Sequence, residues 1–232
     1  PRAVILVVHG GNDRTAEIAE AIGRSDRLVR TIRNRPDYGK GHASKVGILA
    51  AARDLQGTID ADLQFAPEDL PSLLYPVARG ECVLAHASRF RGGDWSPEAR
   101  DRLRDLGNSF LSLLVSALTG TRVTDVTAGF HAWDRRHLLR TWFDDDRFSF
   151  DIELIIRTLA GGYPLREVPV RYRHREAGAS MHRSASAVVR AGFGMLRVIL
   201  SAWFQARLLG RVQASSYPRV RGRRAAGREA AP

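Results

Sequence analysis

The sequence contains a single cysteine, Cys82, and this excludes an internal disulfide. Small secreted domains that depend on disulfides are thereby ruled out, and the composition fits a reducing compartment. No secretory signal peptide is recognisable, so we expect a cytoplasmic protein. A chain of 232 residues, 44% of them hydrophobic, is long enough to bury the core of one sizeable domain with a short appendage.

Acidic residues are almost missing from the last quarter of the chain. Residues 177–232 contain ten arginines and one acidic residue, Glu229, so this segment carries +9 of the formal net charge of +11. A cationic appendage on a nearly neutral body predicts an anionic partner, either a membrane surface or a nucleic acid. We expect no nucleic acid, because the body has little net charge and Tyr217 is the only aromatic residue among the arginines of the tail.

The sequence also lacks an uninterrupted apolar run long enough to span a bilayer. In residues 182–211, apolar residues alternate with arginines at helical spacing, and Arg197 would lie near the middle of a spanning helix. A wide apolar face with an arginine seam predicts a helix that lies in the membrane interface; a helix packed on the domain or in a dimer is the alternative. Residues 212–232 have too little apolar content to fold, so we expect a disordered arginine-rich tail.

Strand-like and helical segments alternate along the first 90 residues. The strand-like segments are 3–8, 27–34, 56–60 and 82–90, and the helical segments between them are 16–22, 45–54 and 67–80. The first strand-like segment is apolar enough to be buried on both faces. This alternation predicts an α/β domain over residues 1–181, with a mainly parallel sheet flanked by helices. Ligands of such sheets bind at the carboxyl ends of the strands.

Two aspartates, Asp60 and Asp62, follow the third strand-like segment at this ligand-binding edge. A D-x-D pair alone is a weak signal. Its carboxylate oxygens nevertheless suit Mg²⁺ or Mn²⁺, which take one or two carboxylates and share their other positions with phosphate and water. A diphosphate leaving group needs this neutralisation of charge. The pair therefore predicts a divalent ion that holds a nucleotide diphosphate.

Five motifs follow one another in order between about residues 3 and 181: VVHGGNDRTAEIA, TIDADLQFAPEDLPSLL, ASRFRGG, TDVTAGFHAWDRR and FSFDIELIIRTLAGGYPLREVPVRYRHREAGAS. Together they resemble family 2 glycosyltransferases with the GT-A fold. The nearest subgroup is that of the polyprenyl-phosphate (dolichyl-phosphate) mannosyl- and glucosyltransferases. The resemblance implies a metal-dependent, inverting transfer of a hexose from GDP-mannose or UDP-glucose to a polyprenyl phosphate at the cytoplasmic face of the membrane.

The resemblance also implies roles for individual residues of this chain. It assigns Asp60 and Asp62 to the metal, Asp125 and Glu153 to the catalytic site, and Asp13, Lys40, Gln64, Arg89 and Arg175 to donor or acceptor binding. A lipid phosphate is mostly ionised near neutral pH, because its second pKa is about 6, and therefore needs alignment more than a strong general base. A base role for Asp125 would matter more for a hydroxyl acceptor.

The sequence departs from the family pattern near its start and after residue 180. Family members begin with a further strand and helix, so we expect the domain to be incomplete at its N-terminus. His9 and Gly10 stand where an Asp-Asp pair is usual, and Met181 stands where a lysine is usual. These departures leave two alternatives: an inactive GT-A-like domain that acts as an adaptor at the membrane surface, or transfer to a different acceptor. The sequence is also compatible with a homo-oligomer.

Overall fold

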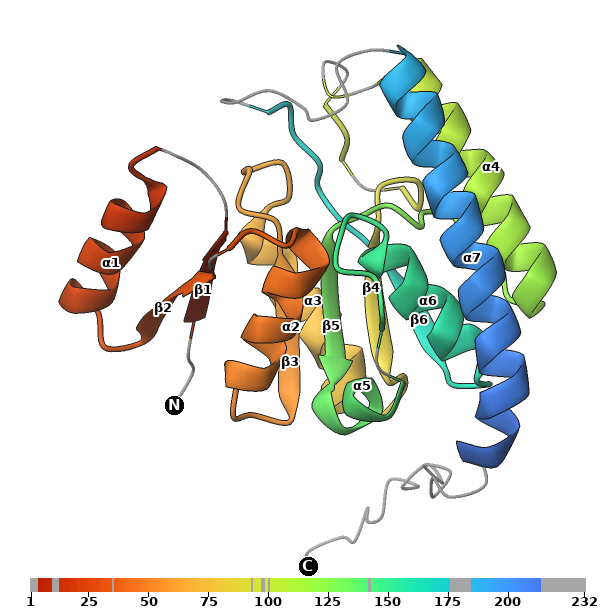
Figure 1. The fold of residues 1–232 in the computed structure, drawn as a ribbon, viewed down its shortest axis with the longest axis horizontal. Helices are drawn as coiled ribbons and strands as arrows, with labels where there is room; N and C mark the ends of the chain where they lie inside the picture. Colours follow the sequence, from red (N-terminus) through yellow and green to blue (C-terminus); the bar gives the residue numbers. More distant parts are fainter. Residues whose placement is uncertain are drawn as a thin grey trace, which may run out of the picture.

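The computed structural model describes residues 4–9, 13–34, 36–92, 94–96, 99, 101–141, 143–175 and 185–213. Its elements are β1 (Val4–His9), α1 (Thr15–Ser25), β2 (Val29–Asn34), α2 (Lys40–Ala50), β3 (Leu55–Ile59), η1 (Pro67–Asp69), α3 (Leu70–Ala78), β4 (Leu84–Ser88), α4 (Arg102–Thr119), β5 (Phe130–Asp134), α5 (Arg135–Thr141), α6 (Phe150–Ala160), β6 (Leu165–Pro169) and α7 (Ala185–Gln213). The predicted alternation of strands and helices is confirmed (Figure 1).

The described strands form two sheets. Strands β1 and β2 pair in parallel, and a second sheet has the order β3-β5-β4-β6. Within it, β3, β4 and β6 run in one direction, and β5 runs against them between β3 and β4. The prediction of a mainly parallel arrangement is thus confirmed for strand direction, whereas both pairings of β5 are antiparallel. The carboxyl ends of β3, β4 and β6 lie at one edge of the sheet, which is where the predicted site residues follow.

Strand β1 is less buried than its sequence predicts. Val4 is 51% exposed, and residues 5–8 are only half-buried. Within the described residues, β1 has a hydrogen-bonded neighbour on one side only, β2, while helices α1 and α2 pack nearby. The prediction that residues 3–8 are buried on both faces is therefore wrong for the described part of this strand, because an apolar run shows suitability for burial and not the presence of neighbours.

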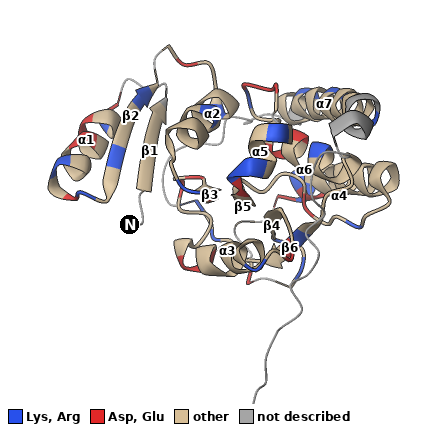
Figure 2. Ribbon diagram, turned by 90° about the horizontal axis from the view of Figure 1, so that it is seen from below, with Lys and Arg blue, Asp and Glu red and all other residues tan. Residues whose placement is uncertain are grey.

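The four-stranded sheet separates two apolar clusters. Alternate residues of β5 supply them: Phe130 belongs to the cluster beneath α3, and Trp133 to the cluster shared with α4, α6 and α7. All five residues of β4 are buried, as expected for a strand covered on both faces. Figure 2 shows α3 on one side of the sheet and α4, α5, α6 and α7 on the other.

Helix α7 coincides with the predicted helix 182–211 to within three residues at each end. Its inner side packs on the domain: Ile199 and Ala202 are buried, and the Trp203 indole donates a hydrogen bond to the Leu118 carbonyl of α4 at 2.9 Å. Within the described residues, Ser186–Arg207 is a helix long and apolar enough to cross a membrane, and most of its residues are exposed or half-buried. The predicted tail lies outside the described residues beyond residue 213.

Candidate active site

The D-x-D pair lies directly after β3, at the carboxyl edge of the sheet. The Asp60 backbone N–H donates to the Gly129 carbonyl at 3.2 Å, which extends the pairing of β3 with β5 by one residue. Leu63 then adopts a left-handed conformation with φ of 62°, which is uncommon for a residue with a side chain. The turn lets the Asp62 carboxylate accept the backbone N–H of Gln64 at 3.2 Å. A residue in this conformation directly after the D-x-D pair is typical of a functional loop.

Lys40 joins the D-x-D pair to helix α6. Its ammonium lies 2.9 Å from Asp60 Oδ2 and 2.9 Å from Asp151 Oδ2. Burial opposes the charge of Lys40, but the two carboxylates outweigh it and raise the pKa of this lysine. Burial raises the pKa of Asp60, and the Asp151 charge adds to this against the effect of Lys40. The site therefore holds a lysine that stays charged and an aspartate that gains from any further cation.

Two buried histidines stand behind Asp151. His131 Nε2 lies 2.8 Å from Asp151 Oδ1, His131 Nδ1 lies 3.0 Å from His86 Nδ1, and His86 Nε2 lies 2.5 Å from the Asp125 carbonyl. The carbonyl can only accept, so His86 Nε2 carries its proton. Burial, helped by His131, lowers the pKa of His86 to about 3, so its Nδ1 is an acceptor and His131 Nδ1 donates to it. The Asp151 carboxylate is thus supported by a chain of buried polar contacts that runs through both histidines to the Asp125 backbone.

Gly129 makes room for the Lys40–Asp60 ion pair. A Cβ atom at this position would lie 2.1 Å from Asp60 Oδ2 and 2.7 Å from Lys40 Nζ. Both distances are far below a van der Waals contact, so only glycine fits beside the paired side chains. The two glycines around Lys40 have a similar purpose, since a Cβ at Gly41 would lie 2.2 Å from the Asp145 carbonyl. They let the start of α2 lie against the segment that precedes α6.

Arg175 neutralises the second aspartate of the pair. Its Nη2 donates to Asp62 Oδ2 at 2.5 Å and to Gln64 Oε1 at 3.2 Å. The Gln64 amide also donates to the Arg173 carbonyl at 3.4 Å, and this ties the loop after β3 to the segment after β6. The fold thus brings together three of the predicted residues, Asp62, Gln64 and Arg175. Asp62 and Arg175 are 113 positions apart in the sequence.

Arg89 and Asp125 form a second, deeper ion pair. Arg89 Nε and Nη2 donate to the two carboxylate oxygens of Asp125 at 2.7 and 2.8 Å. Burial alone would raise the pKa of Asp125, but the charge and hydrogen bonds of Arg89 outweigh it and lower that pKa. The Asp125 side chain is fully buried, whereas 14% of the Arg89 side chain is exposed. Of these two side chains, Arg89 is therefore the one that a ligand can reach.

Aromatic rings and a further acid hold this pair in place. The Arg89 guanidinium lies over the ring of Tyr172, 5.0 Å from its centroid, and over the ring of Trp95 at 5.8 Å. The buried Glu167 carboxylate accepts the backbone N–H of Thr124 at 2.7 Å and that of Asp125 at 3.1 Å. Arg89 is thus held by contacts with Trp95, Asp125 and Tyr172, which come from three separate segments of the chain.

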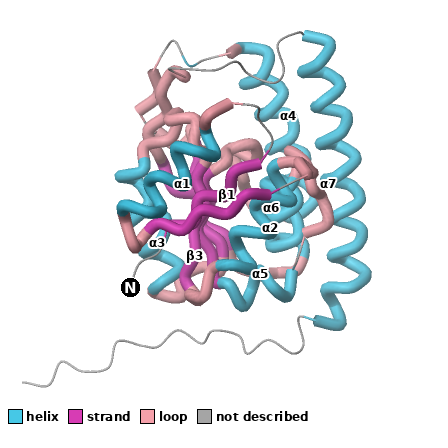
Figure 3. Tube along the Cα trace, turned by 60° about the vertical axis from the view of Figure 1, so that its left-hand side comes forward, coloured by secondary structure: helices cyan, strands magenta, loops and turns pink. Residues whose placement is uncertain are grey.

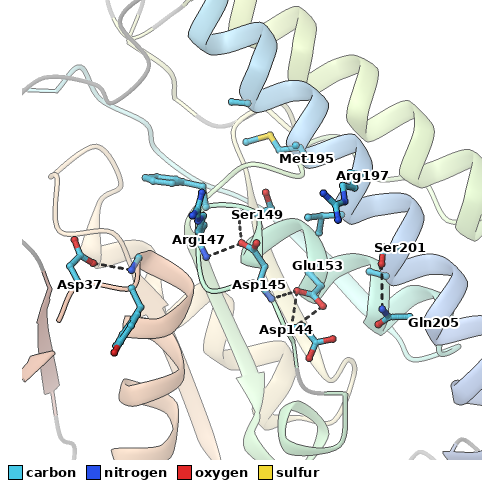
Figure 4. Close-up of a pocket in the computed structure, with 17 residues that line it drawn as sticks. Asp37, Asp144, Asp145, Arg147, Ser149, Glu153, Met195, Arg197, Ser201 and Gln205 are labelled. Carbon is cyan, nitrogen blue, oxygen red and sulfur yellow. Dashed lines mark hydrogen bonds between the residues drawn. The ribbon is translucent and has the colours of Figure 1, made fainter. Parts of the chain in front are cut away.

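Glu153 lies elsewhere, at the pocket shown in Figure 4. Its carboxylate accepts the backbone N–H groups of Asp144 and Asp145 at 2.8 to 3.0 Å and the Arg157 Nε at 2.6 Å. The pocket is a hollow of about 880 Å³ between the start of α2, the segment before α6, and α7. Glu153 thus shapes the loop that Gly41 contacts, and its predicted catalytic role stays a prediction.

Asp13 lies apart from these clusters, at the start of α1. Its carboxylate accepts the backbone N–H of Thr15 at 3.0 Å, and hydrogen bonds to Thr15 lower the pKa of this exposed acid. The structure thus gives Asp13 a turn-forming contact that the sequence alone also allows. Its predicted part in donor binding stays a prediction.

Sequence reasoning missed four residues that the structure places at the site: Asp151, His131, His86 and Gly129. The family resemblance implied a role for Glu153 of FDIEL and not for Asp151, and it implied none for His86 or His131. A partial sequence signal did exist, because His86, His131 and Asp151 stand in the apolar segments VLAHAS, GFHAW and FDIELII, and the structure buries all three. Buried titratable residues need partners, and these three are the partners of one another.

Known proteins resemble this chain in sequence. Residues 2–145 match the family model described as Glycosyl transferase family 2. A dolichyl-phosphate hexose transferase of Haloferax volcanii is 34% identical over 174 residues, which cover 75% of this chain and 72% of that protein. A polyprenol monophosphomannose synthase of Mycolicibacterium smegmatis is 31% identical over 192 residues, which cover 78% of this chain and 70% of that protein.

Solved structures show the same fold. Glucosyl-3-phosphoglycerate synthase of Mycobacterium tuberculosis, crystallised with Mn²⁺, UDP and glucosyl-3-phosphoglycerate, superimposes with a TM-score of 0.65 at 21% identity, covering 87% of this chain and 69% of that one. The α/β architecture is thus that of the GT-A glycosyltransferases, as predicted. From its sequence and its fold, the chain belongs to glycosyl transferase family 2.

Proposed function

We propose that the chain transfers a hexose from a nucleotide sugar to a polyprenyl phosphate. The observation that carries this proposal is the arrangement of charge: three cations, Lys40, Arg175 and Arg89, converge on the strand edge that bears Asp60 and Asp62. Such an edge suits two phosphate-bearing substrates that repel one another. The relatives named for dolichyl-phosphate and polyprenol substrates support a lipid phosphate as the acceptor.

The residues at the strand edge fit a divalent ion. Within the described part of the chain, no group of three or more His, Cys, Asp or Glu side chains could hold a metal by itself. Mg²⁺ and Mn²⁺ usually take one or two carboxylates and complete their shell with phosphate and water, so Asp60 and Asp62 suffice. Each of these carboxylates is paired with a cationic side chain, Asp60 with Lys40 and Asp62 with Arg175. The strand edge therefore stabilises positive charge. When bound, the ion would neutralise charge on the departing diphosphate.

The donor diphosphate would lie between Lys40 and Arg175. Both cations are hydrogen-bonded to the D-x-D pair, and Gln64 orients Arg175. In the transfer, an oxygen of the acceptor phosphate forms a bond to the anomeric carbon, and the bond from that carbon to the nucleoside diphosphate breaks. The diphosphate leaves as an anion, and a single displacement inverts the configuration. Asp13 is a further candidate for nucleotide binding.

The acceptor phosphate would lie on Arg89. Because a lipid phosphate is already an anion near neutral pH, the protein must align it and remove its water rather than deprotonate it. Asp125 serves this as a positioning residue: its lowered pKa makes it a weak base, and its carboxylate holds the Arg89 guanidinium in a bidentate contact. We place the enzyme at the cytoplasmic face of the membrane, where the acceptor headgroup would be presented.

An inactive GT-A-like domain that acts as an adaptor is the second candidate. The observation that favours it is His9 and Gly10 at the position where the family usually has two acids. The retained ion pairs of Asp60, Asp62 and Arg89 speak against it, because an adaptor has no need of them.

Transfer of labelled sugar into an organic-extractable product separates the two candidates. The assay would contain GDP-mannose or UDP-glucose, polyprenyl phosphate and Mg²⁺ or Mn²⁺. We expect label in the lipid phase from the wild type, and a loss of about 100-fold or more in Asp62→Asn. Asp54→Asn, a matched change at an exposed ion pair with Arg136, should keep full activity. Absence of transfer with either donor, from protein shown to be folded by circular dichroism, would favour the adaptor.

A further inference from the structure

His86 and His131 face each other on the two central strands of the four-stranded sheet. They are directly opposite in the register of β4 and β5, and both side chains are fully buried. Their Nδ1 atoms lie 3.0 Å apart, and their rings stack with 4.7 Å between the centroids. Two apolar side chains would fill such a position without the cost of burying polar atoms. A histidine pair in the middle of a sheet therefore indicates a role other than packing.

One end of this pair leads to the site of the nucleotide-sugar donor. His131 Nε2 lies 2.8 Å from one carboxylate oxygen of Asp151, and the other oxygen of Asp151 lies 2.9 Å from Lys40 Nζ. The same ammonium binds Asp60 of the D-x-D pair. Figure 3 shows α2 and α6, the helices that carry Lys40 and Asp151, next to each other. The Phe150 ring covers this end, since it lies 5.3 Å from Lys40 Nζ and edge-on to His131.

The other end of the pair leads to the site of the acceptor phosphate. His86 Nε2 donates to the Asp125 carbonyl oxygen at 2.5 Å. The backbone N–H of Asp125 donates to the buried Glu167 carboxylate at 3.1 Å. The Asp125 carboxylate in turn holds Arg89, the proposed contact of the acceptor phosphate. The backbone of Asp125 is thus held from two sides, and its side chain fixes Arg89 relative to that backbone.

The contacts from Asp151 through His131 and His86 to Asp125, here called the histidine bridge, are shielded from water. The two histidine side chains are fully buried, and the Asp151 side chain is 5% exposed. A polar atom that loses its partner here has no water to replace it, so a break in the bridge is costly. Ligands can reach the residues beyond its two ends, because Lys40 and Arg89 are partly exposed. The bridge therefore fixes the distance between the two substrate sites.

We propose that His86 and His131 are positioning residues that hold the nucleotide sugar and the acceptor phosphate at the distance needed for transfer. This inference rests on the proposed function, because it requires one substrate at Asp60 and another at Arg89. It goes beyond that function by giving a role to two residues that lie behind both sites. A misplacement of about 1 Å between reacting atoms slows a reaction about 100-fold. The histidines therefore act on the rate of transfer and not on the binding of either substrate alone.

Glutamine variants break the bridge at its centre. A glutamine amide takes the place of histidine Nε2 but does not reach the position of Nδ1. His131→Gln thus keeps the contact with Asp151 and loses the one with His86. His86→Gln keeps the contact with the Asp125 carbonyl and loses the one with His131. We expect each variant to lower kcat for transfer about tenfold, while the KM values for nucleotide sugar and polyprenyl phosphate change by less than about twofold.

The double variant tests whether the two histidines act through one shared contact. Because both changes remove the same contact, His86→Gln with His131→Gln should have a kcat within about twofold of either single variant. His86→Asn breaks the bridge at another point, since its amide stays near His131 but loses the Asp125 carbonyl, and should lower kcat by a similar factor. His137→Gln, at a buried histidine that contacts Thr158 outside the bridge, is the control and should keep the wild-type kcat.

Titration with UDP or GDP in the presence of Mn²⁺ gives the fraction of protein that binds nucleotide, and kcat is referred to that fraction. A merely structural role would lower this fraction and leave the corrected kcat unchanged, which would overturn the proposal. Losses that multiply to about 100-fold in the double variant would also overturn it, because they would show two independent defects. A KM raised for one substrate only would assign that histidine to one site. A wild type without transfer would refute the proposed function itself, whereas an active wild type with unaffected variants refutes this inference alone.

Discussion

Lys40 and Asp151 form a buried ion pair, with Lys40 Nζ 2.9 Å from Asp151 Oδ2 and only 5% of the Asp151 side chain exposed. The pair links the first residue of α2 to the first turn of α6, and the same ammonium binds Asp60 of the D-x-D motif. Through Lys40, helix α6 therefore helps to hold Asp60 at the strand edge, although Asp151 lies some 90 residues after Asp60 in the sequence.

Asp151→Asn tests this support. The change keeps the shape of the side chain but leaves Lys40 with one carboxylate and His131 without an anionic partner. Because it breaks a buried ion pair, we expect the free energy of unfolding to fall by about 3 kcal/mol. We also expect transfer to slow about tenfold or more, since Lys40 would shift towards Asp60.

The matched control is Asp146→Asn, which breaks the more exposed pair with Lys45 at 2.7 Å. Urea unfolding should show a loss of no more than about 1 kcal/mol for it. Equal losses for the two variants would mean that Asp151 has no special part in the site.

Gly129→Ala places a methyl group against the Asp60 carboxylate, which we propose as a metal ligand. The new Cβ would lie 2.1 Å from Asp60 Oδ2, so the carboxylate must move away from the position where Lys40 holds it. A displacement of this size at a reacting centre slows catalysis about 100-fold, and we expect that loss in the transfer assay. Gly107→Ala is the control: a Cβ there meets nothing within 4 Å, and α4 should gain up to about 1 kcal/mol. Wild-type activity of Gly129→Ala would show that Asp60 is not held in this position.

The position of Asp60 and Asp62 at the strand edge could be predicted from sequence. The buried contacts of His86 and His131 behind them could not. Asp60 and Asp62 are adjacent to an apolar strand, so local pattern and strand direction suffice to place them. The His86–His131 contact depends on β5 entering the sheet between β3 and β4, and no local pattern shows that order. Burial of β1 was mispredicted for the same reason, because neighbours of a strand are set by topology.

The Arg175–Asp62 pair predicts an effect on metal binding. In this structure Arg175 occupies an oxygen that an ion would use, so Arg175→Gln frees the Asp62 charge. We expect Mn²⁺ to bind the variant more tightly than the wild type when donor is absent. The KM for the nucleotide sugar should rise about tenfold, since one charge-assisted contact to the diphosphate is lost.

Isothermal titration with Mn²⁺ alone and then with donor measures both effects. Arg171→Gln, which breaks a neighbouring pair with Asp69 at 2.7 Å, is the control and should leave Mn²⁺ affinity unchanged. Weaker binding of Mn²⁺ to the Arg175 variant in the absence of donor would contradict the competition between arginine and ion.

Buried neutral histidines make the fold sensitive to acid. Burial lowers the pKa of His137 from 6.5 to about 4, so below pH 6.5 the unfolded chain takes up a proton that the folded chain refuses. The stability from this depressed pKa is complete above pH 6.5 and declines down to about pH 4. The loss is about 1.4 kcal/mol per pH unit for each such histidine, and His86, with a pKa of about 3, adds to it.

Urea unfolding at pH 7, 6 and 5 measures this dependence. His137→Gln keeps a donor for the Thr158 hydroxyl, which lies 3.1 Å from His137 Nε2. The variant should lose about 1 kcal/mol less than the wild type for each unit of acidification below pH 6.5. Parallel curves for the two proteins would show that His137 is protonated, or accessible to protons, in the folded state.

Asp125→Asn separates a positioning role from a base role. If Asp125 holds Arg89, the variant keeps a hydrogen-bonding side chain but loses the bidentate ion pair, so the KM for the acceptor phosphate should rise about tenfold or more. The dependence of kcat on pH should stay that of the wild type, because the acceptor phosphate brings its own charge. Arg89→Lys should behave in the same way, since lysine cannot make the two parallel contacts. If Asp125 were the base instead, kcat would fall by orders of magnitude in Asp125→Asn, its acid limb would disappear, and Arg89→Lys would keep that limb.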